Sequence, residues 1–287
     1  MTKIHELLAQ GPTFSFEMSG PKTPEQEARL ERVLDDLEAL HPSYVSVTYG
    51  AAGSTREGTW EIVEHLARDT TMTPMPHLTC VAHSHDEVVE LVKGYADLGL
   101  QNLLALGGDP PADGIAYPTD FRYALELVEL ARELGDFSVG VAAFPEKHPR
   151  SPDLAVDRRH LADKLRLADF GITQFFFDAD PYFRMLDDLA AAGVDKPVLP
   201  GLMAFVNVDG FRRMSALNDA SIPDDLQRRL DQVNGDPPRV RELAVEVCTE
   251  LAQRLLDGGA PGIHLCTMNF STAAKQIWAN LGLGPRG

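Results

Sequence analysis

The residues of this chain that could do chemistry lie inside apolar runs, where polar and apolar side chains alternate. In the run 14–18, Ser15 and Glu17 alternate with phenylalanine and methionine, and in a later run His77 and Thr79 alternate with leucine and cysteine. Successive side chains of a β-strand point to opposite faces, so each polar set shares one face. On an apolar surface, desolvation raises the pKa of a carboxyl group and makes it a general acid near neutral pH, whereas on an exposed strand end it does not. Glu17 is therefore the first candidate for a proton donor, while His77 alone is more typical of a hydrogen-bonded interior histidine.

A third polar residue, Gln174, interrupts the run Ile172-Thr-Gln-Phe-Phe-Phe-Asp178. A strand this apolar should be buried on both faces, and a buried amide needs hydrogen-bond partners. At the end of a strand those partners are either protein groups or a bound ligand, and the sequence leaves both open. Ser46 and Thr48 alternate with valine in the same way in the run 44–49, and this repetition favours the ligand.

A glycine-rich turn and a basic cluster complete the candidate residues. The turn Gly107-Gly108-Asp109 has strong turn chemistry, but its glycines equally let a flat ligand approach the backbone. The basic residues would ordinarily form a solvated face, yet in so acidic a protein they are the best candidates for holding phosphates. They are Lys147, His148, Arg150, Arg158, Arg159 and Lys164. His83 and His85 resemble the HxH pair of metal-dependent hydrolases, but no matching histidine and aspartate close later strands, so we expect no metal site.

The composition restricts the partners and the compartment. The 287 residues carry a formal net charge of −17, which argues against nucleic acid and anionic membranes as partners. No run approaches the roughly 20 apolar residues of a transmembrane helix, and the N-terminus lacks the layout of a signal peptide. The three cysteines form no CxxC pair, as in a protein with reduced core thiols. We therefore expect a cytoplasmic protein whose ligands are small molecules.

Eight β-like runs alternate with amphipathic, helix-like stretches along the chain. The runs are 14–18, 44–49, 75–80, 102–107, 138–144, 171–177, 197–204 and 262–268. This alternation predicts a parallel sheet, and eight such units in about 250 residues are the number of a closed (β/α)8 (TIM) barrel. A doubly wound open sheet is the alternative, but its GxGxxG phosphate fingerprint is missing. We predict a single α/β barrel domain over residues 1–287, with an elaborated segment around 205–240 and an active site at the carboxyl ends of the strands.

Six motifs of this chain resemble those of the 5,10-methylenetetrahydrofolate reductase family. They are Phe16-Glu17 followed by Pro21-Lys22-Thr23, Val45-Ser-Val-Thr-Tyr-Gly50, Pro76-His-Leu-Thr-Cys80, Gly108-Asp109-Pro110, Pro145-Glu146 with His148-Pro149, and Ile172-Thr-Gln-Phe-Phe-Phe-Asp178. The resemblance runs from Phe14 to about Asn269, nearly the whole chain. It implies a (β/α)8 barrel, in agreement with the number of strand–helix units.

The resemblance also implies a reaction, the reduction of 5,10-methylenetetrahydrofolate to 5-methyltetrahydrofolate. In that reaction a carboxylic acid protonates N10 and opens the five-membered ring to an N5 iminium, which a hydride then reduces. Glu17 matches the family's general acid, Asp109 the aspartate that stabilises positive charge on the pterin, and Gln174 the amide that contacts folate and nicotinamide. Phe176 is expected at the folate as well. The residues expected at the family's flavin site are Thr48, Tyr49, His77, Gly108, Phe144, His148 and Lys164.

Several positions depart from that flavin site. Gly107 stands where the family usually has an arginine, Phe144 where it has a tyrosine, and Asp163 where it has a basic residue. An aspartate beside a diphosphate is repulsive, and in a partly buried site this reversal of charge weakens binding. The chain is therefore most similar in character to the flavin-independent, mycobacterial-type members. In these, NADH passes its hydride directly to the iminium, so we expect FAD to be absent.

Three alternatives stay open: an FAD-dependent version of the same reaction, a metal-dependent barrel hydrolase built on His83 and His85, and a pterin-binding barrel without catalysis. The choice of NADH over NADPH rests only on the acidic balance of the chain. The way the folate tail is held is also open, because Phe270 replaces an arginine and Gly210 lies in a segment without the family's usual proline and glutamine. Oligomeric state and polyglutamate preference are open as well.

Overall fold

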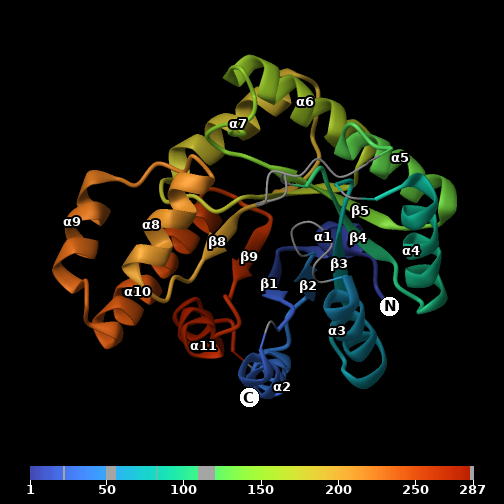
Figure 1. The fold of residues 1–287 in the computed structure, drawn as a ribbon. Helices are drawn as coiled ribbons and strands as arrows, with labels where there is room; N and C mark the ends of the chain where they lie inside the picture. Colours follow the sequence, from blue (N-terminus) through green and yellow to red (C-terminus); the bar gives the residue numbers. More distant parts are fainter. Residues whose placement is uncertain (22, 50–55, 82, 109–119, 285–287) are drawn as a thin grey trace.

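One parallel sheet contains the strands of the computed structural model, which describes residues 1–21, 23–49, 56–81, 83–108 and 120–284. The strands are β1 (Thr13–Ser19), β2 (Tyr44–Thr48), β3 (Pro74–Thr79), β4 (Asn102–Leu106), β5 (Ser138–Ala143), β6 (Phe170–Thr173), β7 (Val198–Leu199), β8 (Gly201–Met203) and β9 (Gly262–Cys266). Their order is β7-β6-β5-β4-β3-β2-β1-β9-β8, and every neighbouring pair is parallel. The helices lie around the outside of this sheet (Figure 1). The predicted parallel α/β architecture is confirmed.

The sheet closes into a barrel through β7 and β8. Only Pro200 separates these two short strands, and β7 pairs with β6 whereas β8 pairs with β9. Because proline has no N–H to donate, the ladder changes partner at this residue. Gly201 then donates its N–H to Thr173 Oγ1 at 2.8 Å across the join. When β7 and β8 are counted together as one strand, the described strands form the predicted (β/α)8 barrel.

Two strands differ from their predicted extent. The sixth was expected over 171–177 but ends at Thr173, and the seventh is divided at Pro200. The sixth strand stops because its neighbour stops: Ala143 is the last residue of β5, and its carbonyl accepts the N–H of Gln174 at 2.8 Å. The residues after Gln174 have no further ladder to join, so the alternation expected for them does not apply.

The helices that connect the strands begin close to the carboxyl ends of the strands. They are α1 (Ile4–Gln10), α2 (Pro24–Glu38), α3 (Arg56–Asp69), α4 (His85–Asp97), α5 (Ala124–Leu134), α6 (Leu154–Leu167), α7 (Ala179–Ala191), α8 (Val208–Leu217), α9 (Asp224–Val233), α10 (Pro237–Asp257) and α11 (Ser271–Asn280). Side-chain caps set several starts: Thr23 accepts the N–H of Gln26, and Ser84 forms a capping box with Glu87. Among the described residues, no helix combines the length and apolar character needed to cross a bilayer.

The barrel strands divide their side chains between two apolar clusters. The outward residues pack against the helices in the main core, which includes Phe16, Val47, Leu78, Leu103 and Val141. The inward residues form a plug inside the barrel, made of Ile4, Tyr44, Met75, Leu104, Phe170, Ile172 and Leu199. Ile4 comes from α1, so the plug fills the end of the barrel at which the strands begin. Only the other end of the interior is left for polar chemistry.

A third apolar cluster lies to one side of the barrel, around α8, α9 and the first half of α10 (Figure 1). These helices occupy the segment around 205–240 that the sequence analysis described as elaborated. Phe175 from the loop after β6 and Met203 from β8 join the same cluster as Phe211 of α8. The cluster therefore packs α8, α9 and the first half of α10 against the side of the barrel formed by β6 and β8.

Candidate active site

Inward-facing polar side chains of β1, β2 and β9 meet near the carboxyl ends of the strands, an opening that we call the mouth. The register places Ser15 beside His264, and Glu17 between Cys266 on one side and Ser46 on the other. Their outward neighbours on the same strands belong to the main core, so the alternation predicted for β1 and β2 is confirmed. The result is two stacked layers, with Ser15 and His264 below Glu17, Ser46 and Cys266.

The Glu17 carboxylate lies between two histidine rings. Its Oε2 is 3.5 Å from Nε2 of His264 and 3.9 Å from Nε2 of His77. The Glu17 side chain is 23% exposed, whereas the side chains of His264 and His77 are 3% and 5% exposed. The carboxylate is therefore the member of this cluster that a ligand entering the mouth can contact.

The expected rise in the pKa of Glu17 is wrong for the protein without a ligand. Burial alone raises the pKa, but the hydrogen bond with His264, together with the other polar groups around the carboxylate, outweighs burial, and the pKa is lowered. A carboxylate is thus the stable form while nothing covers Glu17. A general acid at this position must acquire its proton together with its substrate.

The other two ionisable neighbours of Glu17 are held in their neutral forms. Burial lowers the pKa of His77 to about 4, although the charge of Glu17 acts in the opposite direction. In the described part of the chain, His77 Nε2 has no hydrogen-bond partner. Burial and the charge of Glu17 raise the pKa of the Cys266 thiol well above its ordinary value. At neutral pH these residues are an uncharged ring and a thiol.

His264 was missed by the sequence analysis and is the best-connected residue of the site. Its Nδ1 is 2.7 Å from Ser15 Oγ, and its Nε2 is 3.2 Å from Ser46 Oγ. The ring stacks on Tyr44 with centroids 5.8 Å apart and planes at 15°. A signal was available, because His264 alternates with isoleucine and leucine in the last apolar run just as His77 does in the third.

Gln174 lies directly after β6, and both ends of its amide have protein partners. Its Nε2 donates to Asn218 Oδ1 at 3.0 Å, and its Oε1 accepts the N–H of Phe175 at 3.0 Å. Asn218 ends α8, so the amide joins the barrel to this helix. The sequence left open whether the partners of this amide are protein groups or a ligand. In the structure, protein groups bond both ends of the amide. A ligand contact can use the second N–H of the amide, or it can displace Asn218 from the first.

Two residues expected at the substrate have different outcomes. Phe176 is 2% exposed, belongs to the main core and stacks on Tyr182 of α7 with centroids 5.9 Å apart. The structure therefore does not bring its ring to the mouth, because the chain leaves the strand before this position. Asp109 lies outside the described residues, so its predicted role at the pterin stays a prediction.

The residues expected near the cofactor on β2 and after β4 make local contacts that shape the mouth. Thr48 donates to the carbonyl of Met18 at 2.7 Å, and the Tyr49 hydroxyl is 2.9 Å from His83 Nε2. Gly108 has a φ of +80°, and a Cβ there would lie 3.0 Å from Val81. A side chain at this position is therefore disfavoured both by the backbone conformation and by the close contact. These contacts hold the loops around Glu17 in place.

The comparisons with known proteins agree with this arrangement. The family model described as methylenetetrahydrofolate reductase matches residues 3–282. The chain belongs to the methylenetetrahydrofolate reductase family. Its relatives are named as reductases, which are oxidoreductases. The 5,10-methylenetetrahydrofolate reductase of Pectobacterium carotovorum is 32% identical over 272 residues, which cover 94% of this chain and 90% of that protein. The Escherichia coli reductase is 32% identical over 273 residues, covering 94% and 91%.

A plant relative and a solved structure extend the comparison. Methylenetetrahydrofolate reductase (NADH) 1 of Zea mays is 33% identical over 300 residues, which cover 98% of this chain and 50% of the maize protein. A Clostridium thermocellum protein, described as binding two copies of 5-methyl-5,6,7,8-tetrahydrofolic acid, superposes with a TM-score of 0.68 at 14% identity, over 98% of this chain and 99% of that one. This likeness shows the same fold.

The residues expected at the flavin site after β5 and on α6 are closely packed. The ring of Phe144 meets His148 edge to face at 4.5 Å, and His148 Nδ1 accepts the N–H of Arg150 at 3.1 Å. Lys164 Nζ donates to the carbonyl of Ala142 at 2.6 Å, and burial lowers the pKa of this lysine to about 8. Asp163 is exposed and pairs with Arg166, so its charge faces solvent on the outside of α6.

Most side chains of the basic cluster expected to hold phosphates contact the protein itself, while Arg159 is exposed. Arg150 donates to the carbonyl of Gly108 at 2.9 Å, and Lys147 donates to the carbonyl of Ser151 at 2.9 Å. Arg158 pairs with Asp157 and Asp188 and donates to the carbonyl of Phe144 at 3.0 Å. These hydrogen bonds and ion pairs stabilise the loop between β5 and α6, which gives the basic residues of this segment a structural role.

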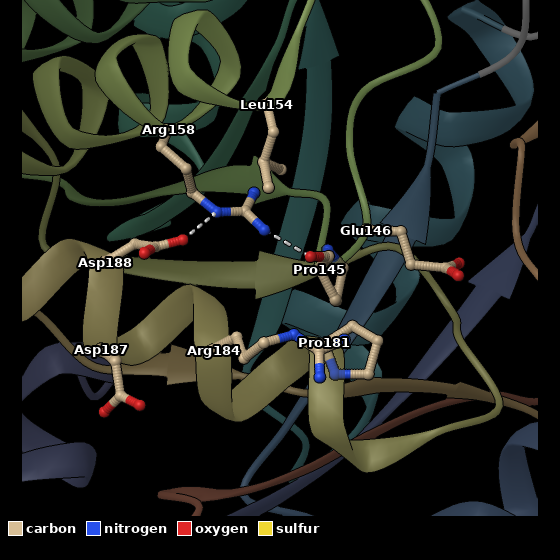
Figure 2. Close-up of a pocket in the computed structure, with 8 residues that line it drawn as sticks. All are labelled: Pro145, Glu146, Leu154, Arg158, Pro181, Arg184, Asp187 and Asp188. Atoms are coloured by element: carbon tan, nitrogen blue, oxygen red, sulfur yellow. Dashed lines mark hydrogen bonds and ion pairs between the residues drawn. The ribbon is translucent and has the colours of Figure 1, made fainter.

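A groove of about 540 Å³ lies on the outside of this segment, between the start of α6 and the part of α7 from Pro181 to Asp188 (Figure 2). Arg158 spans it between Asp188 and the carbonyl of Pro145, and Arg184 lines the opposite side. None of the residues predicted for catalysis lines this groove. It is separate from the mouth that contains Glu17.

The histidines considered as metal ligands have other contacts. His83 is buried against Tyr49, while His85 is exposed and stacks on Phe121 with centroids 6.0 Å apart. The described residues contain no group of three or more side chains arranged to hold a metal ion.

Proposed function

We propose that this protein reduces 5,10-methylenetetrahydrofolate to 5-methyltetrahydrofolate, with NADH as the direct hydride donor and without a flavin. The observation that carries the proposal is the Glu17 carboxylate, 23% exposed at the mouth and supported from within by His264 and His77. The family membership supplies the reaction, and the NADH in the name of the maize relative supports the choice of donor. The C. thermocellum neighbour binds the methylated product on the same fold.

The proposed chemistry begins when the pterin covers Glu17. Removing the remaining water destabilises the carboxylate, so the proton-bearing form of Glu17 becomes favourable under the substrate. Glu17 then protonates N10, the ring opens to the N5 iminium, and the nicotinamide delivers its hydride to the iminium carbon. Asp109 is proposed to stabilise the charge on the pterin, and Gln174 to contact the folate and nicotinamide.

The residues at the family's flavin positions fit a flavin diphosphate poorly. A diphosphate needs donors with free capacity, but Lys164 already donates to Ala142 and Arg158 is neutralised by two aspartates. Phe144 offers a ring edge to His148 where a hydroxyl would be needed. The proposed hydride transfer from NADH to the iminium needs no flavin.

A visible spectrum and an NADH-oxidation assay test this proposal together. We expect the purified protein to show no flavin band after gel filtration, and to oxidise NADH only when methylenetetrahydrofolate is present. Added FAD should leave the rate unchanged. A retained flavin band that is reduced by NADH and reoxidised by methylenetetrahydrofolate would establish the FAD-dependent alternative, and no substrate-dependent oxidation would leave only pterin binding.

A cation at the rim of the mouth offers a place for the folate tail. The guanidinium of Arg29 on α2 lies over the ring of Phe270, 4.4 Å from its centroid. Phe270 directly follows the turn after β9, and Asn269 in this turn forms hydrogen bonds of 2.9 and 2.7 Å with Ser19 at the end of β1. The nearby carboxylate of Asp36 is paired with Lys275 instead. We propose that Arg29, held by Phe270, binds the glutamyl carboxylates of the substrate.

Replacing Arg29 by alanine is expected to raise KM for methylenetetrahydrofolate about tenfold with little change in kcat, because the contact is made equally before and during the reaction. Steady-state kinetics measure the two constants. Arg32→Ala on the exposed face of α2 removes the same charge and should behave as wild type. A substrate without the glutamyl group should lose the distinction between the two variants, and an equal KM for wild type and Arg29→Ala would contradict the assignment.

A further inference from the structure

The amide of Gln174 belongs to a chain of hydrogen bonds that starts and ends at the backbone. The N–H of Phe175 donates to Gln174 Oε1 at 3.0 Å, and Gln174 Nε2 donates to Asn218 Oδ1 at 3.0 Å. Asn218 Nδ2 in turn donates to the carbonyl of Met214, one turn earlier in α8, at 2.9 Å. Two side-chain amides therefore connect the residue after Gln174 with the last turn of α8.

The backbone groups at the two ends fix the polarity of both amides. A backbone N–H can only donate and a backbone carbonyl can only accept. Gln174 must therefore turn its oxygen toward Phe175, and Asn218 must turn its nitrogen toward Met214. The oxygen of Asn218 is then the group that meets the nitrogen of Gln174. If either amide turned over, two donors or two acceptors would face each other.

Gln174 keeps hydrogen-bonding capacity for a ligand in this arrangement. Its Nε2 carries a second N–H and its Oε1 a second lone pair, and no further described residue bonds its side chain. The side chain follows the carboxyl end of β6 and is half-buried. A ligand in the mouth therefore meets a donor and an acceptor held in fixed positions, and it does not have to immobilise a flexible side chain.

The backbone ends α8 without help from the Asn218 side chain. Asp219 has a φ of +54°, and the N–H of Ala220 donates to the carbonyl of Ser215 at 2.9 Å, as in a Schellman motif. These two features close the helix after Asn218 whatever side chain that residue carries. The end of α8 is thus already defined when the amide of Asn218 reaches Gln174.

Other contacts attach the same segment to the barrel. Ser221 donates its N–H to Oε2 of Glu146, in the loop after β5, at 2.9 Å. Phe175, in the loop after β6, is buried in the apolar cluster of α8, α9 and α10. Because the backbone and the apolar cluster already hold the helix, the task that remains for the Asn218 side chain is the orientation of Gln174.

We propose that Asn218 is a positioning residue, which holds the amide of Gln174 with one fixed polarity at the mouth. This inference rests on the proposed function, in which Gln174 contacts the folate and the nicotinamide. Asn218 acts through Gln174 and needs no contact of its own with either ligand.

Two substitutions of Asn218 separate this task from a structural one. For Asn218→Ala we expect kcat/KM for methylenetetrahydrofolate to fall about threefold to tenfold, the effect of one neutral hydrogen bond. Asn218→Asp keeps an oxygen for Gln174 but loses the N–H for Met214 and places a negative charge at the C-terminal end of α8. It should recover most of the lost activity while unfolding at a lower temperature than Asn218→Ala. Steady-state kinetics and thermal unfolding followed by circular dichroism measure the two effects.

A double-mutant cycle identifies the residue through which Asn218 acts. In a Gln174→Ala background, Asn218→Ala should cause no further loss of kcat/KM. Asn234→Ala is the matched control, because it makes the same change at the exposed end of α9 and should keep the wild-type rate. Equal losses from Asn218→Ala in both backgrounds, or an Asn218→Asp protein that is less active than Asn218→Ala, would overturn the inference.

A measurement without turnover distinguishes this inference from the proposed function. In protein labelled with ¹⁵N in its glutamine side chains, the NMR signal of Gln174 is the one that disappears in Gln174→Ala. Its N–H proton bonded to Asn218 should shift upfield in Asn218→Ala and stay downfield in Asn218→Asp. An identical signal in wild type and Asn218→Ala would also overturn the inference. A wild-type protein that never oxidises NADH would instead reject the proposed function, and the signal would still show whether Asn218 orients Gln174.

Discussion

Replacing Glu17 by glutamine is expected to lower kcat for methylenetetrahydrofolate reduction by about 10²- to 10⁴-fold, the usual contribution of a general acid. Glutamine keeps the size of the side chain and can still bond His264, but it has no acidic proton to give to N10. Because the change removes an interaction needed only on the way to the transition state, NADH binding should persist. Stopped-flow measurement of NADH oxidation and fluorescence titration of NADH measure the two effects separately.

Glu90→Gln is the matched control for this experiment. Glu90 is exposed on α4, so the same chemical change there should leave both measurements at wild-type values. A Glu17→Gln protein that turns over at the wild-type rate would remove Glu17 from the mechanism. Loss of NADH binding together with turnover would instead point to a collapse of the mouth.

Replacing Gly201 by alanine is expected to destabilise the fold by about 3 kcal/mol or more. Gly201 lies at the join of β7 and β8, where its N–H bonds Thr173 Oγ1 at 2.8 Å. A Cβ at this position would overlap the backbone carbonyl oxygen of Thr173, and a backbone atom in a ladder cannot move aside as a flexible side chain can. Urea unfolding followed by circular dichroism measures the change.

The control for this prediction is Gly58→Ala in α3. A Cβ there meets no atom within 4 Å, and alanine favours a helix over glycine, so the free energy of unfolding should stay within about 1 kcal/mol of wild type, on the stable side. An unchanged unfolding midpoint for Gly201→Ala would mean that the join of β7 and β8 can open to accept a side chain. In that event the closure of the barrel would depend less on this close approach than the geometry indicates.

The sequence by itself determined the parallel barrel and the inward direction of Glu17 and His77. Both follow from local periodicity, because alternation of polar and apolar residues can be counted along one strand. The same count extended the sixth strand too far, since a strand ends where its neighbours end and β5 stops at Ala143. The ring of Phe176, which the family resemblance placed at the folate, packs in the core instead.

The tertiary structure alone decided the electrostatics and the partners of the site. Ser15 and His264 are 249 positions apart in the chain, yet their side chains are 2.7 Å apart, and this pair places His264 against Glu17. Its presence reverses the shift in the pKa of Glu17 that burial alone would produce. The pairing of Gln174 with Asn218 and the stacking of Arg29 on Phe270 likewise join distant segments. Periodicity reports which way a side chain points, but contacts between distant segments determine what it meets, and the charge state of an acid depends on what it meets.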